Sequence, residues 1–348
     1  MSLRIQEPRA PKISDAAPVG GLVSVAVPAP ASEIRRFLQK RGSSGMADST
    51  FRWVMLICAL SIFAIVGLIA TELVMSSKLT LVKFGWKFFV GSSWDPVNND
   101  FGALPFIYGT LVSSLVALAL AVPLAVGVAV FLTEMCPRAL RGILSFLTEL
   151  LAAIPSVVYG LWAVFVLVPL LRGYVNPVLI KLLGWTGLFV PPDFGIGMFA
   201  AGVILAIMIL PIISSLTREV MTAVPHAQRE AVLALGATRW EMIRMGVLRN
   251  ARIGIVGSVI LGLGRALGET MAVAMVIGSS PTISKSLLAP ASTMASVIAN
   301  EFAEASDDKY RSALIEIGLA LFLVTIVVNI FARLLVWAVT RGTPARAA

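Results

Sequence analysis

Residues 106–132 read FIYGTLVSSLVALALAVPLAVGVAVFL, a run without a single charged side chain. A helix needs about 20 mostly apolar residues to cross the hydrocarbon core of a bilayer, so this stretch is long enough to span a membrane. Five further stretches meet the same criterion, at residues 53–75, 143–171, 196–217, 253–278 and 313–339. The sequence therefore predicts an all-α integral membrane protein with six transmembrane helices.

The composition agrees with this prediction. Of the 348 residues, 58% are hydrophobic and 14% are charged, and the mean hydropathy is +0.90. A soluble domain has about 45–50% apolar and about 25% charged residues, so a water-soluble enzyme and a disordered chain are excluded. The two cysteines, Cys58 and Cys136, are too few and too far apart in the sequence for a disulfide scaffold.

The basic residues predict the orientation, because short loops rich in Lys and Arg remain in the cytoplasm. With the N-terminus inside, the cytoplasmic side holds 19 of the 28 Lys and Arg residues, counting Arg333 near the inner end of the sixth span, the outer segments hold 8, and Arg265 lies inside the fifth span. Both termini are therefore expected in the cytoplasm. The net charge of +9 is then explained by topology and by contact with anionic lipid, so no nucleic-acid partner is expected.

The ends of the chain differ from its middle in composition. Residues 1–50 are rich in Pro, Ala, Ser and Gly and are predicted to form a disordered cytoplasmic tail. Within this tail, Ser32 begins a basic stretch ending at Arg41, which forms either a short amphipathic helix on the membrane surface or a solvated segment. Residues 51–340 are the predicted transmembrane domain, and residues 341–348 are a predicted cytoplasmic tail.

The predicted cytoplasmic loop at residues 218–252 contains the most informative motif. Pro225 and Gly236 bracket an Ala-rich stretch, and Gly commonly ends one helix and permits the turn into the next. We therefore expect a helix, a turn and a second helix that present apolar and charged side chains to the cytoplasm. The simpler interpretation is an amphipathic helix without a partner, which many membrane proteins have.

Glu230-Ala231-Val232, three further residues and Gly236 resemble the EAA loop of the permease family of ABC importers. The pattern of that family is E-A-A, three residues, G, nine residues and I-x-L-P, and its loop is a coupling helix that sits in a groove of an ATPase subunit. The resemblance implies ATPase-coupling residues in this chain at Glu230, Ala231, Gly236, Ala237, Arg239 and Trp240.

The loop departs from the family pattern at three positions. Val232 replaces the second Ala, Gly246 replaces the Ile and Arg249 replaces the Pro. The last change leaves open how the chain enters the next span. The position of the motif supports the resemblance, because the loop is on the inside by the charge count and lies two spans before the C-terminus, as in the family.

Two charged residues, Arg265 and Glu269, lie within the predicted fifth span. They are four residues apart and would share one face of a helix. Ionisable residues inside a membrane normally have a partner and mark a functional site, although an ion pair that merely allows the helix to insert is the alternative. Glu149, near the cytoplasmic end of the third span, adds a second carboxylate. Two carboxylates with a single Arg leave one negative charge unpaired. Three explanations are open: one carboxyl is protonated, Glu149 is solvated by the cytoplasm, or another chain supplies an Arg.

No catalytic, nucleotide or metal site is expected in this chain. Gly262, Gly264 and Gly268 have the wrong spacing for a dinucleotide-binding loop, and the Lys-Ser/Thr of a P-loop does not follow them. The single histidine, His226, is not accompanied by Cys or carboxylate residues at ligand spacing. The chain is therefore predicted not to be an enzyme and to bind no cofactor itself.

The sequence GLGRALGETMAV at residues 262–273 resembles the corresponding span of the permeases of phosphate-specific ABC importers, as do residues 147–160 and 298–305. The similarity covers about residues 50–340 and implies the fold of a type I ABC importer permease. It implies a substrate pathway that includes Arg265, Glu269, Thr270, Glu149 and Ser156. A guanidinium suits this role, because it stays charged and compensates the high cost of taking a phosphate ion out of water.

The same resemblance implies the partners. It predicts a multi-pass subunit of the bacterial inner membrane that pairs with a related second permease, with two ATPase subunits that bind ATP and Mg²⁺, and with a periplasmic phosphate-binding protein. Two alternatives remain open. One is a permease for another substrate, such as sulfate, molybdate or a polyamine. The other is a non-transporting membrane scaffold or channel.

Overall fold

The computed structural model describes residues 44–340, so the stretch from Ser32 to Arg41 and the predicted tail at 341–348 lie outside the described residues. The chain divides into two compact units, residues 1–64 and 65–348, and the division falls within helix α2 (Ser44–Ser76). The described part of the first unit is helical, and its large apolar side chains are exposed, as suits a segment surrounded by lipid. Residues 44–50, which were predicted to belong to the N-terminal tail, are helical because α2 extends beyond its apolar part to Ser44, and the rest of that predicted tail lies outside the described residues.

Within the described residues, six helices are long and apolar enough to cross a membrane. They span Asp48–Ser76, Leu104–Met135, Ser156–Thr186, Met198–Thr222, Arg239–Leu267 and Asp308–Leu334. The predicted all-α fold with six spans is confirmed. The third and fifth spans differ most from their predicted limits, because each is interrupted inside its predicted range and continues past one of its predicted ends.

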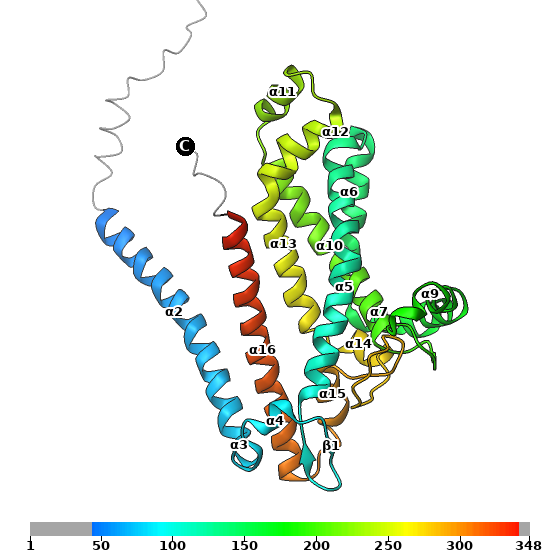
Figure 1. The fold of residues 1–348 in the computed structure, drawn as a ribbon. Helices are drawn as coiled ribbons and strands as arrows, with labels where there is room; N and C mark the ends of the chain where they lie inside the picture. Colours follow the sequence, from blue (N-terminus) through cyan, green and yellow to red (C-terminus); the bar gives the residue numbers. More distant parts are fainter. Residues whose placement is uncertain (1–43, 341–348) are drawn as a thin grey trace, which may run out of the picture. The chain divides into compact units, whose positions relative to one another are not determined.

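The second unit continues from α2 through short elements into the long helices (Figure 1). Its first half contains α3 (Lys78–Phe84), α4 (Lys87–Val90), β1 (Trp94–Asp95), β2 (Asp100–Phe101), α5 (Leu104–Val130), the π-helical η1 (Phe131–Met135), α6 (Arg138–Ala153), α7 (Ser156–Trp162), η2 (Ala163–Leu167), α8 (Val168–Leu170), η3 (Leu171–Val175), α9 (Asn176–Leu183) and η4 (Gly184–Thr186). Its second half contains α10 (Met198–Thr222), α11 (His226–Ala234), α12 (Arg239–Glu241), η5 (Met242–Leu248), α13 (Arg249–Leu267), α14 (Met271–Val276), α15 (Met294–Glu301) and α16 (Asp308–Thr340).

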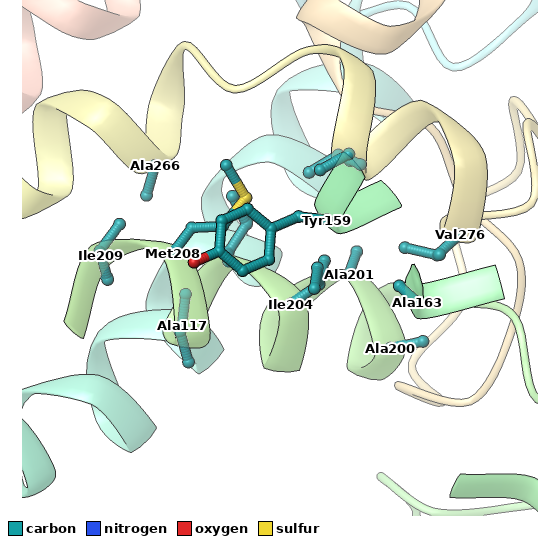
Figure 2. Close-up of a cluster of buried hydrophobic side chains, with 14 of the residues drawn as sticks. Ala117, Tyr159, Ala163, Ala200, Ala201, Ile204, Met208, Ile209, Ala266 and Val276 are labelled. Atoms are coloured by element: carbon teal, nitrogen blue, oxygen red, sulfur yellow. The ribbon is translucent and has the colours of Figure 1, made fainter. Parts of the chain in front are cut away.

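Helix α10 forms the centre of this unit. It packs against α5 and α13, and its apolar side chains make up much of the largest buried cluster, shown in Figure 2. On α5, Ala117, Ala121 and Ala125 recur every four residues and are completely buried. Small residues at this spacing allow two helix backbones to approach closely, which is how membrane helices commonly associate.

The third span was predicted at residues 143–171, but the helix is broken within that range. Ile154 and Pro155 adopt extended backbone angles, so α6 ends at Ala153 and α7 begins at Ser156. Proline lacks an amide hydrogen and disfavours the helical conformation of the residue before it, which explains the break. The membrane-length helix therefore starts at Ser156 and continues to Thr186, while α6 is a separate helix with every residue at least partly exposed.

The fifth span was predicted at residues 253–278, but it is continuous only from Arg239 to Leu267. Gly268 ends α13, and after a short connection α14 begins at Met271. Glycine is common just past the end of a helix, and Gly268 occupies that position here, whereas Gly262 and Gly264 lie inside α13 without interrupting it. At the other end, Arg249 lies in an unbroken helix, and the chain enters the span without the turn that the motif proline would impose.

The two ends of this unit carry different elements. In Figure 1, α11 and α12 lie at one end, whereas the β1–β2 hairpin and α15 lie at the other. The hairpin pairs Trp94 with Phe101, and both rings pack near Tyr310 of α16. The loop with the EAA-like motif is thus well separated from the hairpin end of the bundle.

Candidate functional site

The interruption of the fifth span holds the two charged residues that the sequence singled out. Arg265 lies in the last turn of α13, and Glu269 lies in the connection to α14. The distance from Arg265 Nη2 to Glu269 Oε2 is 3.8 Å, which places the two as an ion pair. The expectation that they share one continuous helix face was wrong, because the helix ends between them. Their proximity follows from the break itself.

The two members of this pair differ in exposure. The Arg265 side chain is 42% exposed, whereas that of Glu269 is 6% exposed. The Glu269 carboxylate also accepts a hydrogen bond from the backbone N–H of Ala272 at 3.4 Å, which fixes it to the start of α14. A guanidinium has five N–H donors, so Arg265 retains donors for an anion that reaches it from its open side. Interrupted helices of this kind are common at the binding sites of transporters.

Two hydroxyl residues predicted for the pathway lie at the ends of helices. Thr270 is in the same connection as Glu269, and its hydroxyl donates to the carbonyl of Gly268 at 3.3 Å. Ser156 is the first residue of α7, one turn before Gly160. A Cβ on Gly160 would lie 3.2 Å from Ala272 Cα and closer still to the Met275 side chain, so glycine permits α7 to pack directly against α14. Helix α7, which follows the break at Pro155, therefore contacts α14, which follows the break at Gly268.

Glu149 has a different partner from the ones considered at the sequence level. Its Oε1 accepts a hydrogen bond from Arg218 Nη2 at 2.7 Å. Arg218 belongs to α10 of the same chain, so neither a protonated acid nor an Arg from another chain is required. The Glu149 side chain is 57% exposed, which also agrees with partial solvation. The sequence did not reveal this pair because its members are 69 residues apart on helices whose packing only the fold defines.

The loop with the EAA-like motif forms the predicted helix, turn and second helix. Helix α11 follows Pro225, the turn is at Gly236, and α12 begins after Thr238, which forms a capping box with Glu241. The predicted coupling residues lie on this exposed surface: Glu230, Ala231, Gly236, Arg239 and Trp240 are exposed and Ala237 is half-buried. Three large apolar side chains, Leu233, Leu235 and Trp240, are exposed on this short loop, and several such side chains on one surface are typical of a protein contact.

Gly236 is required by its backbone conformation. Its φ of +84° lies in the left-handed region, which disfavours residues with a Cβ. A Cβ added there would meet no atom of the described chain within 4 Å. Steric room inside this chain is therefore not what selects glycine at the turn.

A buried ion pair that the sequence analysis did not identify connects α11 to the long helices. Arg229 Nε and Nη2 donate to Glu134 Oε1 of η1 at 3.2 and 3.0 Å. The same guanidinium donates to the carbonyls of Met221, at 2.9 Å, and Val224 at the end of α10. Both charged side chains are largely buried. Arg229 thus connects α11 to the ends of both α5–η1 and α10.

Glu316 of α16 is a second acid that the sequence analysis overlooked. It lies inside the sixth span and is completely buried. Neither of its carboxylate oxygens has a hydrogen-bond partner among residues 44–340. The signal was present in the sequence, as a Glu within an apolar run, and such residues are rare and usually functional in membranes.

Comparison with known proteins defines the class first. Residues 121–341 match the family described as "Binding-protein-dependent transport system inner membrane component". A crystal structure of a bacterial ABC transporter involved in the import of the acidic polysaccharide alginate contains a chain of similar fold, with a TM-score of 0.57. The two chains are 17% identical, and the similarity covers 86% of this chain and 100% of the other. The fold and the family match define an integral-membrane transport permease.

Relatives of known name narrow the assignment. The phosphate transport system permease protein PstC of Mesorhizobium japonicum is 44% identical over 316 residues, which are 90% of this chain and 94% of the relative. PstC of Haemophilus influenzae is 45% identical over 293 residues, covering 83% and 93% of the two chains. The chain belongs to the PstC family of phosphate transport system permeases.

Proposed function

We propose that this chain is a transmembrane permease subunit of an ATP-driven importer that moves inorganic phosphate into a bacterial cell. The observation that carries the proposal is the identity of 44–46% to relatives named phosphate transport system permease protein PstC. That similarity extends over 90% and 85% of this chain. Both the interrupted fifth span and the EAA-like loop lie inside the matched region.

The chemistry of the break supports an anionic substrate. Arg265 offers a permanent positive charge on a partly open side chain, next to a buried carboxylate that keeps the empty site near neutral. Phosphate would take donors of Arg265 that Glu269 does not use. The 3.8 Å separation of the pair is long for a hydrogen bond, so the anion need not displace a hydrogen bond between Arg265 and Glu269.

The proposal includes partners. The importer would contain a related second permease, two ATPase subunits that hold ATP and Mg²⁺, and an extracytoplasmic phosphate-binding protein. The exposed surface of α11 and α12 would dock on the ATPase, and both chain termini would lie in the cytoplasm of a bacterium whose inner membrane holds the complex. This permease subunit would hydrolyse no ATP itself.

The test is uptake by the complex reconstituted with its partners in proteoliposomes, using labelled phosphate, sulfate and molybdate. We expect ATP-dependent uptake of phosphate in preference to the other two. Uptake of sulfate or molybdate instead would assign a different oxyanion. Failure of the chain to co-purify with an ATPase subunit would contradict a permease role and favour a scaffold or channel.

A further inference from the structure

A cavity of about 620 Å³ lies between α6, α10 and η1, apart from the break in the fifth span. Its lining residues belong to η1, α6 and the last turns of α10, and α6 lies toward the same end of the unit as α11 and α12 (Figure 1). Its lining includes two basic residues, two acidic residues and several hydroxyl residues, so the formal charges of the lining balance: Arg141, Arg218, Glu149, Glu219, Ser145 and Ser215. Guanidinium and hydroxyl groups are the side chains that bind phosphate and related oxyanions in proteins.

Of the two arginines, Arg218 is better placed to bind an anion in the cavity. Its side chain is 23% exposed, so it is partly shielded from water yet reaches the cavity. Among the described residues, its hydrogen bond is the one from Nη2 to Glu149 Oε1 at 2.7 Å. The remaining N–H donors are available to a second acceptor. Arg141 is more exposed and donates one hydrogen bond to the carbonyl of Thr133 at 2.8 Å.

The packing of α10 against α13 shows how far Arg218, in the lining of this cavity, lies from Arg265 along the helix axis. The hydroxyls of Thr217 and Ser258 are 2.8 Å apart, and a Cβ on Gly262 would contact Ile213. The two helices are therefore antiparallel, and Arg218 lies close to the level of residue 257 of α13. Arg265 is eight residues further along α13, which corresponds to about 12 Å at 1.5 Å per residue.

We infer that the cavity is a second oxyanion site, at which the anion pauses before it leaves toward the coupling-loop end. This inference rests on the proposed function. Arg218 binds the anion, and it forms its ion pair with Glu149 again when the anion leaves. Glu149 is suited to this exchange because a half-exposed carboxylate holds its partner weakly. A site of this kind shortens the distance that a desolvated anion must travel without a cation.

The experiment measures equilibrium binding of labelled phosphate to the purified complex of permeases and ATPases, without the binding protein. All variants carry Arg265→Ala, so that binding reports the cavity. Against this parent, we expect Glu149→Gln to tighten phosphate binding by about two- to fivefold, the effect of removing a partly exposed ion-pair competitor. Arg218→Gln should weaken binding about tenfold or more, because a charged hydrogen-bond donor is lost.

The matched control is Glu219→Gln, which removes the same charge from the lining of the same cavity without freeing Arg218. We expect it to tighten binding less than Glu149→Gln does. Equal tightening in the two variants would reduce the effect to general electrostatics and overturn the inference. Equal loss of binding in Glu149→Gln and Arg218→Gln would show a structural ion pair, and no measurable binding in the parent and in Glu149→Gln would show no site.

A phosphate group also occurs in lipid headgroups, so the binding is repeated in nanodiscs of phosphatidylcholine with and without phosphatidylglycerol. Unchanged phosphate binding supports a site for the soluble anion, and its loss with phosphatidylglycerol overturns that assignment in favour of a headgroup. Retention of the ATPase subunits in size-exclusion chromatography shows that each variant assembles. Uptake by the unmodified complex tests the proposed function separately, so either idea can fail while the other stands.

Discussion

At the scale of single residues, Arg265 and Glu269 differ in exposure, as expected of a pair whose cation meets a substrate. The guanidinium is open and the carboxylate is buried. A pair that only neutralises charge should recover much of its function when the two charges are exchanged, apart from the hydrogen bond that Glu269 accepts from Ala272. A pair in which the cation meets the substrate depends on which member is exposed.

The charge exchange tests this difference. We expect Arg265→Ala and the double variant Arg265→Glu with Glu269→Arg both to lower phosphate uptake about tenfold or more, since a charged hydrogen bond to the substrate is lost. Assembly with the ATPase should remain near normal, as checked by co-purification. Uptake close to wild type in the exchange variant would return the pair to a structural role.

Gly236 is the other residue whose conformation leads to a prediction. At a φ of +84°, Asn is tolerated, Ala is strained by about 1–2 kcal/mol and a β-branched residue more. We expect the amount of phosphate transported per ATP hydrolysed to be highest in Gly236→Asn, lower in Gly236→Ala and lowest in Gly236→Val. The chain should still insert in the membrane in all three variants.

The Asn variant also distinguishes two reasons for the glycine. If Gly236→Asn is uncoupled as severely as Gly236→Val, the restriction is steric and comes from the ATPase surface, because the chain itself leaves the space open. If all three variants couple normally, the turn does not transmit motion and the coupling role of the loop is wrong.

At the scale of elements, Arg229 connects α11 to η1 and to the end of α10. Its guanidinium satisfies Glu134 and two carbonyls at the end of α10. Removing one member of a buried pair commonly costs about 3–5 kcal/mol, because the other charge is left without compensation. Replacing Glu134 with Gln keeps an acceptor oxygen for Arg229 and should cost less.

We therefore expect Arg229→Met to increase hydrogen exchange of the α11 amides strongly and to lower the transport yield per ATP. Glu134→Gln should produce a smaller change in both, and Arg229→Lys, which keeps the charge with fewer donors, should lie between them. The measurement is hydrogen–deuterium exchange of the purified complex, followed by mass spectrometry of peptides from the loop. Unchanged exchange in Arg229→Met would contradict a tether.

At the scale of the whole molecule, the orientation in the membrane is a prediction from the charge count alone, and labelling tests it directly. In a background without Cys58 and Cys136, a cysteine at Ser93 or Thr282 should be labelled by an impermeant thiol reagent from the periplasmic side. A cysteine at Thr238 should not be labelled. All three positions are exposed, so a negative result at Thr238 reports the side of the membrane.

Ser292 lies in the same predicted outer segment but is buried, so it is unsuitable for this assay. Labelling of Thr238→Cys and protection of Ser93→Cys would reverse the topology and remove the coupling assignment with it.

The sequence by itself determined the class of fold, the number of spans, the helix–turn–helix form of the loop and the nearness of Arg265 and Glu269. These features depend on local properties: apolar length, Pro and Gly positions, and a separation of four residues. The tertiary structure decided which residues are exposed and which distant ones meet. It pairs Glu149 with Arg218 and Glu134 with Arg229, residues that are 69 and 95 positions apart in the sequence. Such pairs depend on how α5, α6 and α10 pack, and helix packing is set by the fit of many side chains at once, which no local pattern encodes.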